Sequence, residues 1–174
     1  GSAATPQTSA KFANVSIFIG DGAVDKKYRS AFRIRRNSAL SVYNSVVVGG
    51  YVAKGGLELE GSAAQANFVA GRSDYAGLAI TGMSTPLVSG DATLLNQAAR
   101  KNLFGPNVSD LGLSSGYNRL AGKPSLLLAS GARLANAGVT LPSGFEANTL
   151  VGAFGLTGDW TEGWTNWDPQ NTDY

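Results

Sequence analysis

Three short stretches decide how this chain is expected to fold: Phe32-Arg-Ile-Arg35, Leu57-Glu-Leu-Glu60 and Leu78-Ala-Ile-Thr81. In each of them apolar residues alternate with residues of another kind, which is the period of a strand with one buried face. The first residues of the three stretches lie 25 and 21 positions apart. This spacing predicts a repeat in which Phe32 stacks on Leu57 and Leu57 on Leu78.

A second series of segments alternates with the first. Asn14–Gly20, Asn44–Gly49 and Asn67–Gly71 each begin with Asn, continue with a short, largely apolar run and end with Gly. Because Asn tolerates left-handed backbone angles, we expect the three asparagines at corners between strands. A repeat of about 21 to 30 residues with two short strands is typical of one coil of a parallel β-solenoid. Short alternating strands also permit an antiparallel β-sandwich.

The register of the expected stack also predicts how charges pair. With the apolar residues facing inward, Arg33 and Arg35 face outward beside Glu58 and Glu60 of the next strand. Adjacent strands lie about 4.8 Å apart. Each opposite pair would therefore contribute about 0.2–1 kcal/mol to stability.

The pattern changes after residue 83. Asp91 is placed to cap a helix over residues 93–104, and Val151-Gly-Ala-Phe154 predicts a last short strand. We therefore expect one domain with three parts. Residues 1–10 form a flexible segment that opens with a Gly-Ser resembling a cloning scar, 11–83 form the coils, and 84–174 form the helix, last strands and C-terminal capping region.

The composition excludes several kinds of chemistry. The chain has no Cys and no His, which excludes disulfides, thiolate or imidazole metal ligands, and Ser-His or Cys-His nucleophiles. Its Gly-rich segments match neither a P-loop nor a dinucleotide fingerprint. We therefore expect no catalytic residues, no cofactor and no metal. The net charge of +2 indicates no nucleic-acid partner, and no apolar run reaches the ~18 residues of a membrane helix.

Several segments resemble a known group of proteins. The segment from Gly122 to Gly131 (GKPSLLLASG) resembles a stretch near the end of secreted right-handed parallel β-helix proteins of the pectin-lyase-like kind, and Leu150-Val-Gly-Ala-Phe154 resembles their closing strand. Residues 159–171 (DWTEGWTNWDPQN) resemble the ending of uncharacterised exported β-helix proteins of Bacteroidetes. The resemblance implies a right-handed β-helix, here of about three to four coils, that is secreted or displayed on the outer cell surface. It also implies that the chain is the C-terminal part of a longer protein.

Three tryptophans, Trp160, Trp164 and Trp167, lie within eight residues. One interpretation is that they cap the open core of the last coil, and the other is that they bind sugars through their apolar faces. Arg33, Arg35 and Arg36 are further candidates for contact with a glycan or protein partner.

The favoured function at this point is a non-enzymatic extracellular or cell-surface β-solenoid scaffold, acting in adhesion or in self-assembly through an exposed solenoid end. The alternative is a carbohydrate-binding or polysaccharide-lyase-like module. In pectin-lyase-like enzymes the site combines a basic residue with several Asp that line up on one face of successive coils. In this sequence no such line of Asp residues follows the repeated strands.

Overall fold

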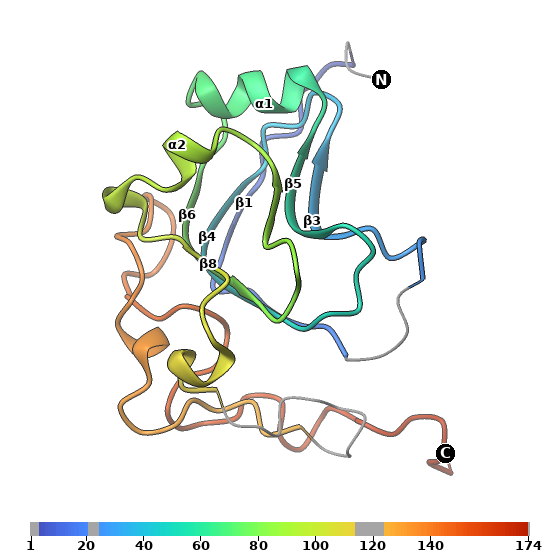
Figure 1. Cartoon of the computed structure of the whole chain (residues 1–174). Coiled ribbons are helices and arrows are strands. Elements are labelled where there is room, and N and C mark those ends of the chain that lie inside the picture. Colours follow the sequence, from blue (N-terminus) through green and yellow to red (C-terminus); the bar gives the residue numbers. More distant parts are fainter. Residues whose placement is uncertain (1–3, 21–24, 114–123, 174) are drawn as a thin grey trace.

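The chain forms two parallel β-sheets that face each other across an apolar layer. The computed structural model describes residues 4–20, 25–113 and 124–173. Sheet A contains β1 (Lys11–Ala13), β2 (Ser16–Phe18), β4 (Ser41–Val48), β6 (Tyr75–Thr81) and β8 (Leu103–Phe104). Sheet B contains β3 (Ser30–Arg35), β5 (Gly55–Glu60) and β7 (Leu87–Ser89). Figure 1 shows the two sheets side by side, with successive strands alternating between them from β2 to β8.

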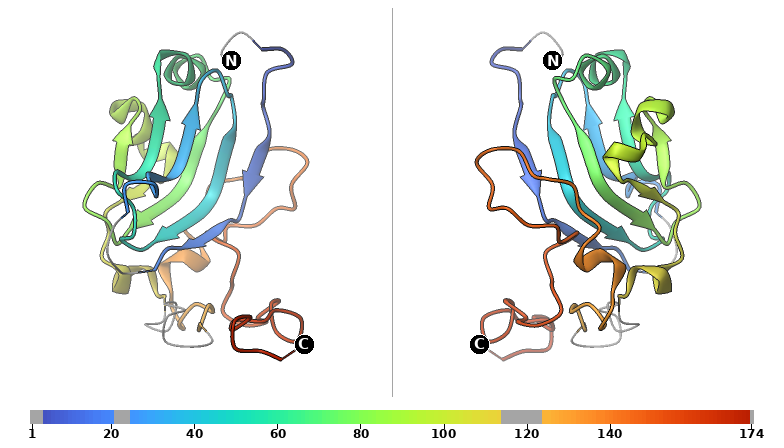
Figure 2. Two further views of the ribbon diagram at one scale, coloured as in Figure 1. Left: turned by 90° about the vertical axis from the view of Figure 1, so that its right-hand side faces the viewer. Right: turned by 90° about the vertical axis from the view of Figure 1, so that its left-hand side faces the viewer.

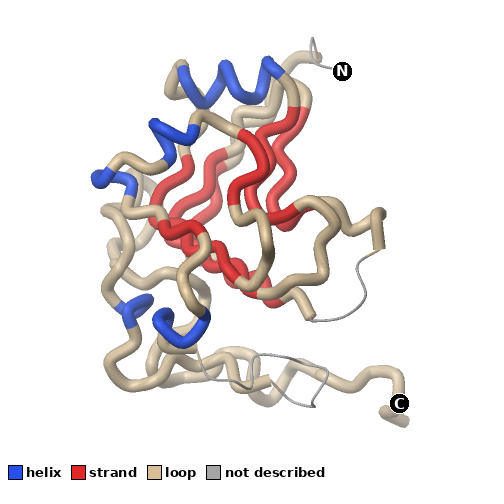
Figure 3. Tube along the Cα trace, viewed as in Figure 1, coloured by secondary structure: helices blue, strands red, loops and turns tan. Residues whose placement is uncertain are grey.

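Helices are few and short. In the described part of the chain they are α1 (Ser62–Val69), α2 (Ala92–Leu95) and the 3-10 turns η1 (Ala98–Arg100), η2 (Val108–Leu111) and η5 (Arg133–Ala135). Figure 3 shows that most of the remaining chain is loop. Among the helices that the structure describes, none has the length and apolar character that a membrane span requires.

The predicted β-helix of three to four coils is wrong, and so is the description of the chain as a solenoid. The strands form two open parallel sheets, and β5 is joined to β6 by the helix α1 rather than by a further strand. The arrangement is closer to that of an α/β protein with parallel sheets. The antiparallel β-sandwich is also wrong, because every pair of named strands is parallel. All these folds contain short strands at regular spacing in which apolar and polar residues alternate, so this pattern could not distinguish one fold from another.

The predicted register is correct for the first two strands of the repeat and wrong for the third. Phe32 pairs with Leu57, and the next positions of β3 and β5 follow in the same register. Leu78, however, lies on β6 in sheet A, where it pairs with Ser45. The next neighbour of Leu57 within sheet B is Leu87. The 21 residues after Leu57 include α1, and this crossover carries the chain to the other sheet.

The central strands of sheet A, β4 and β6, are buried on both faces. Val47 and Ile80 point into the layer between the sheets, together with Leu57 and Leu59 of sheet B. Val46 belongs to a second apolar cluster on the opposite face of sheet A. That cluster also contains buried residues of the C-terminal half: Leu111, Leu128, Leu134 and Val151. Figure 2 shows the chain after residue 124, coloured orange to red, running outside sheet A.

The corner position predicted for the three asparagines is correct for Asn14, which lies between β1 and β2, and wrong for Asn44 and Asn67, which lie within β4 and α1. The expected left-handed backbone angle is found at Asn14 and Asn44. Asn14 and Asn44 have φ values of 55° and 43°, and Gly77, with φ 69°, lies level with Asn44 on the neighbouring strand. The three residues form a column of left-handed positions across sheet A. Asn67 is different, because it lies buried in α1 and donates hydrogen bonds to residues 37 and 38.

The helix predicted over 93–104 is shorter in the structure. Asp91 does cap α2, because its carboxylate accepts a hydrogen bond from the Leu94 N–H at 2.9 Å. Asn102 then diverts the chain. Its side chain donates to the carbonyls of Tyr75 and Leu95 and accepts from the N–H of Leu78, and these bonds bring β8 alongside β6.

Residues 151–154, expected to form a strand, are a bent segment outside the sheets. Val151 donates its N–H to the Leu134 carbonyl, and Gly152 donates to the Asn44 carbonyl. This segment carries the tryptophans to their place on sheet A.

Candidate functional site

The C-terminal segment is fixed to the outer face of sheet A where β2 and β4 meet. The N–H of Ala153 donates to the Ser16 hydroxyl at 2.9 Å, and the Asn14 amide donates to the Leu150 carbonyl at 2.6 Å. Gly152 has φ +99°, and a Cβ there would lie 2.7 Å from the Ser16 hydroxyl oxygen. Only glycine therefore lets the segment approach this closely.

An aromatic row begins at this anchor. The Phe154 ring packs on Phe18 of β2, with ring centroids 6.4 Å apart. Trp160 stacks on Phe154 at 5.5 Å, and Trp164 stacks on Trp160 at 5.8 Å. We call Phe18, Phe154, Trp160 and Trp164 the aromatic row. It runs from a buried ring to exposed ones, since Phe154 is 7% exposed whereas Trp160 and Trp164 are 54% and 69% exposed.

Hydrogen bonds hold both exposed indoles in position. Trp160 Nε1 donates to the Ala153 carbonyl at 2.9 Å, and Trp164 Nε1 donates to the Trp160 carbonyl at 2.6 Å. Both ring faces are therefore oriented by the chain itself. Trp160 and Trp164 belong to neither of the two buried apolar clusters, so the interpretation of the tryptophans as a cap over the core gains no support from the packing.

A cavity of about 290 Å³ opens beside the aromatic row. Its walls are mostly apolar and include Phe18, Leu126, Phe154, Trp160 and Trp167. Trp167 thus belongs to the same site as the other tryptophans, although no stacking joins it to them. The buried Thr161 contributes a polar edge, where its hydroxyl donates to Asp159.

The sequence indicated the tryptophans as candidates but gave no sign of the two phenylalanines. Phe18 and Phe154 are separated by most of the chain, and each lies in an apolar run that is also typical of core residues. Only the close approach at Gly152 brings them together.

The predicted arginine candidates lie elsewhere, on and next to β3 in sheet B. Arg33 and Arg35 face Glu58 and Glu60 across the β3–β5 ladder, as the register predicted. Arg33 Nε donates to Glu60 at 2.6 Å, and Arg35 Nε lies 3.8 Å from the same carboxylate. Arg36 follows the strand at an exposed position with φ 60°. The structure therefore does not join the arginines and tryptophans into one site.

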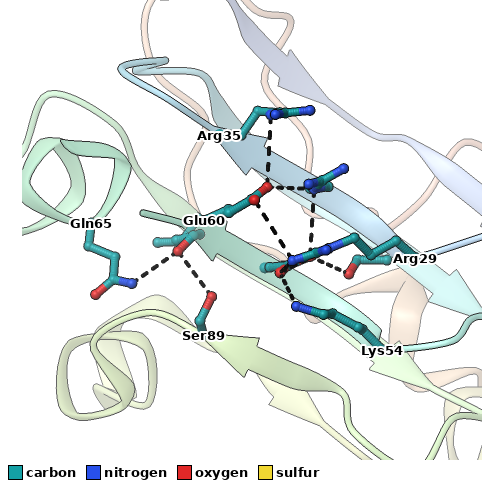
Figure 4. Close-up of polar contacts among 10 residues, drawn as sticks. Arg29, Arg35, Lys54, Glu60, Gln65 and Ser89 are labelled. Atoms are coloured by element: carbon teal, nitrogen blue, oxygen red, sulfur yellow. Dashed lines mark hydrogen bonds and ion pairs between the residues drawn. The ribbon is translucent and has the colours of Figure 1, made fainter. Parts of the chain in front are cut away.

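Two basic residues complete this ion-pair cluster, which Figure 4 shows. Arg29 donates to Glu58 through Nε and Nη2 at 3.0 and 2.8 Å, and Lys54 Nζ donates to it at 3.0 Å. The Arg29 guanidinium lowers the pKa of Glu58 from its ordinary value of 4.5 to about 2, against the opposing effect of burial. Arg33 likewise lowers the pKa of Glu60. Six charged side chains therefore form one network: Arg29, Arg33, Arg35, Lys54, Glu58 and Glu60.

Within the described part of the chain, no group of three or more acidic residues gathers in a way that could hold a metal ion. Comparisons with protein-family models, curated proteins and solved structures found no match for this chain.

Proposed function

We propose that this chain is a carbohydrate-binding module that recognises sugars on its aromatic row. The single observation that supports the proposal is the stack of Trp160 and Trp164, exposed, fixed in orientation and adjoining a cavity. One face of many pyranose rings carries mainly C–H groups, and such faces pack well on the electron-rich face of an indole. Exposed apolar patches of this kind usually mark interaction sites.

The energetics favour a binding role over a purely structural one. An indole that stays half exposed loses on the order of 2 kcal/mol of the stabilisation that full burial of the ring would give. Both N–H groups of Trp160 and Trp164 are already satisfied by backbone carbonyls. A ligand therefore meets rings whose rotamers are fixed, and it pays little entropy for ordering them.

The size of the cavity sets the expected ligand. A volume of about 290 Å³ lies at the lower end of small-molecule sites, which suits one or two sugar units beside the stacked rings. Larger glycans would extend over the exposed face of Trp164. Export to the cell exterior is part of this proposal, and it rests on the resemblance of residues 159–171 to exported proteins.

Glycan binding by the full chain and by Trp164→Ala provides the test. Trp164 ends the row and is mostly exposed, so its replacement should leave the fold intact. Sugar binding should weaken by about tenfold or more, as it does when a residue at the centre of an interface is truncated. A glycan array selects the ligand, and titration calorimetry measures its affinity.

Tyr28→Ala is the matched control. Tyr28 is also an exposed aromatic residue, at 57%, but its ring packs against Tyr51 and does not line the 290 Å³ cavity beside the aromatic row. The proposal requires Tyr28→Ala to retain full affinity. Equal affinity of Trp164→Ala and the unmodified chain, with unchanged circular dichroism, would rule out the aromatic row as the binding site.

A further inference from the structure

Strand β3 has a free edge. Sheet B runs in the order β3-β5-β7, so β3 has β5 as its one strand partner in the described part of the chain. Among the described residues no strand pairs with the opposite edge of β3, so the backbone N–H and C=O groups along that edge are open to a further strand. Such edges are ready templates for another extended segment.

The side chains along this edge carry an excess of positive charge. The ion-pair cluster contains four basic groups and two carboxylates. Glu58 and Glu60 therefore leave two positive charges uncompensated. Arg35 lies 3.8 Å from Glu60, its one ion-pair contact among the described residues, and is 48% exposed. The exposed Arg36 follows it.

The spacing of these charges matches that of a strand. Arg33 and Arg35 lie two residues apart on one strand, about 7 Å along its axis. On the paired side, the carboxylates of Glu58 and Glu60 meet them at the same spacing. A second strand with carboxylates at alternate positions would repeat this match on the free side.

The opposite face of β3 leads to an apolar opening. A cavity of about 420 Å³ lies between the edges of β2 and β3, where the layer between the sheets ends. Ile17, Ile19, Tyr28, Ala31 and Tyr51 are among its lining residues. Alternate side chains of an added strand would face this cavity, and apolar ones would fill it.

We infer that the free edge of β3 is a docking site for an extended segment of another protein, in which acidic and apolar residues alternate. The segment adds to sheet B as a further strand, with its carboxylates beside Arg33 and Arg35 and its apolar residues over the cavity. A second copy of this chain is a poor occupant. Antiparallel pairing of two β3 strands would place arginines opposite arginines, which is destabilising.

A peptide whose sequence is that of residues 55–62, Gly-Gly-Leu-Glu-Leu-Glu-Gly-Ser, is the direct probe, because β3 already accepts this sequence on its other side. Fluorescence anisotropy of the labelled peptide with the full chain measures affinity. Hydrogen exchange locates the contact. We expect saturable binding and slower exchange of the β3 amides. Replacing both glutamates by glutamine should weaken binding about two- to thirtyfold, the loss expected from two cross-strand charge pairs.

Arg35→Glu should weaken binding to a similar extent, and Arg133→Glu is its control. Arg133 lies on the distant turn η5 at an exposed position, so both variants change the net charge equally. Circular dichroism verifies that each variant is folded. Equal loss in the two variants would show that net charge alone attracts the peptide, and it would overturn the proposal.

Two further probes separate strand addition from simple charge attraction. A peptide with N-methylated leucines keeps its carboxylates but loses backbone hydrogen bonds, so its binding should be abolished. If it binds as well as the parent peptide, or if a sulfated dextran displaces the peptide and gives the same exchange pattern, the surface is a polyanion site and the proposal is wrong. A dimer of the free chain that the peptide dissociates would identify a second copy as the occupant and overturn the proposal equally.

Discussion

At the scale of single residues, Glu58 is the group on which the charge pattern of sheet B depends. Its side chain is only 4% exposed, and Arg29, Ser30 and Lys54 all donate hydrogen bonds to it. A buried carboxylate is stable only with such partners, because desolvation of an unpaired charge is costly. The sequence indicated the pairing of the alternating arginines and glutamates. It did not indicate that Arg29, outside the alternation, would be the principal partner of Glu58.

The lowered pKa of Glu58 predicts how stability depends on pH. The folded pKa of about 2 lies below the ordinary value of 4.5, so the folded state favours the ionised carboxylate. The resulting stabilisation is complete above about pH 5.5 and is lost as the pH falls toward 2, with a total on the order of 3 kcal/mol. Glu58→Gln should remove most of this acid dependence and lower the free energy of unfolding at pH 7 by about 3 kcal/mol.

Urea unfolding of both proteins between pH 2 and 7 measures this dependence. Glu60→Gln is the control, because Glu60 is more exposed than Glu58 and its replacement should have a smaller effect. If Glu58→Gln shows the same loss of stability in acid as the unmodified chain, another carboxylate is responsible.

At the scale of elements, the sequence predicted which residues pair between two neighbouring strands better than it predicted which sheet each strand joins. The β3–β5 register followed from alternation and opposite charges, which are local properties. The assignment of β6 to sheet A depends on α1, because this helix carries the chain from one sheet to the other. The residues of α1 have no apolar stripe by which the sequence could have marked them as a helix. Likewise, Phe18 and Phe154 meet only because Gly152 lets the two segments touch, a relation that no local pattern in the sequence shows.

Gly152 therefore tests whether the aromatic row depends on this contact. In Gly152→Ala, the new Cβ would lie 2.7 Å from the Ser16 hydroxyl and 2.8 Å from Val46 Cγ1, and φ +99° is unfavourable for alanine. We expect a loss of about 1–3 kcal/mol in stability and a change in tryptophan fluorescence as the row shifts. Gly155→Ala is the control, since its Cβ would have no neighbour nearer than 3.9 Å. Equal effects of the two substitutions would contradict the proposed role of the close approach.

At the scale of the whole molecule, two apolar clusters share one sheet. Val47 of β4 points to the layer between the sheets, whereas Val46 and Val48 point to the cluster on the outer face. Opening either face would therefore expose the same buried strands. For this reason we expect the C-terminal segment and the sheets to unfold together, even though that segment has little regular secondary structure.

Leu134→Ala examines this cooperativity. Leu134 is fully buried in the outer cluster, so its truncation should cost about 2–5 kcal/mol. Tryptophan fluorescence reports on the C-terminal segment, and far-ultraviolet circular dichroism reports on the strands. Because β4 joins the two clusters, both signals should shift to the same lower midpoint. Leu156→Ala, at a half-exposed position, should leave both midpoints nearly unchanged. An early fluorescence transition, with the circular dichroism midpoint unmoved, would mean that the segment carrying the aromatic row detaches from a sheet core that is stable without it.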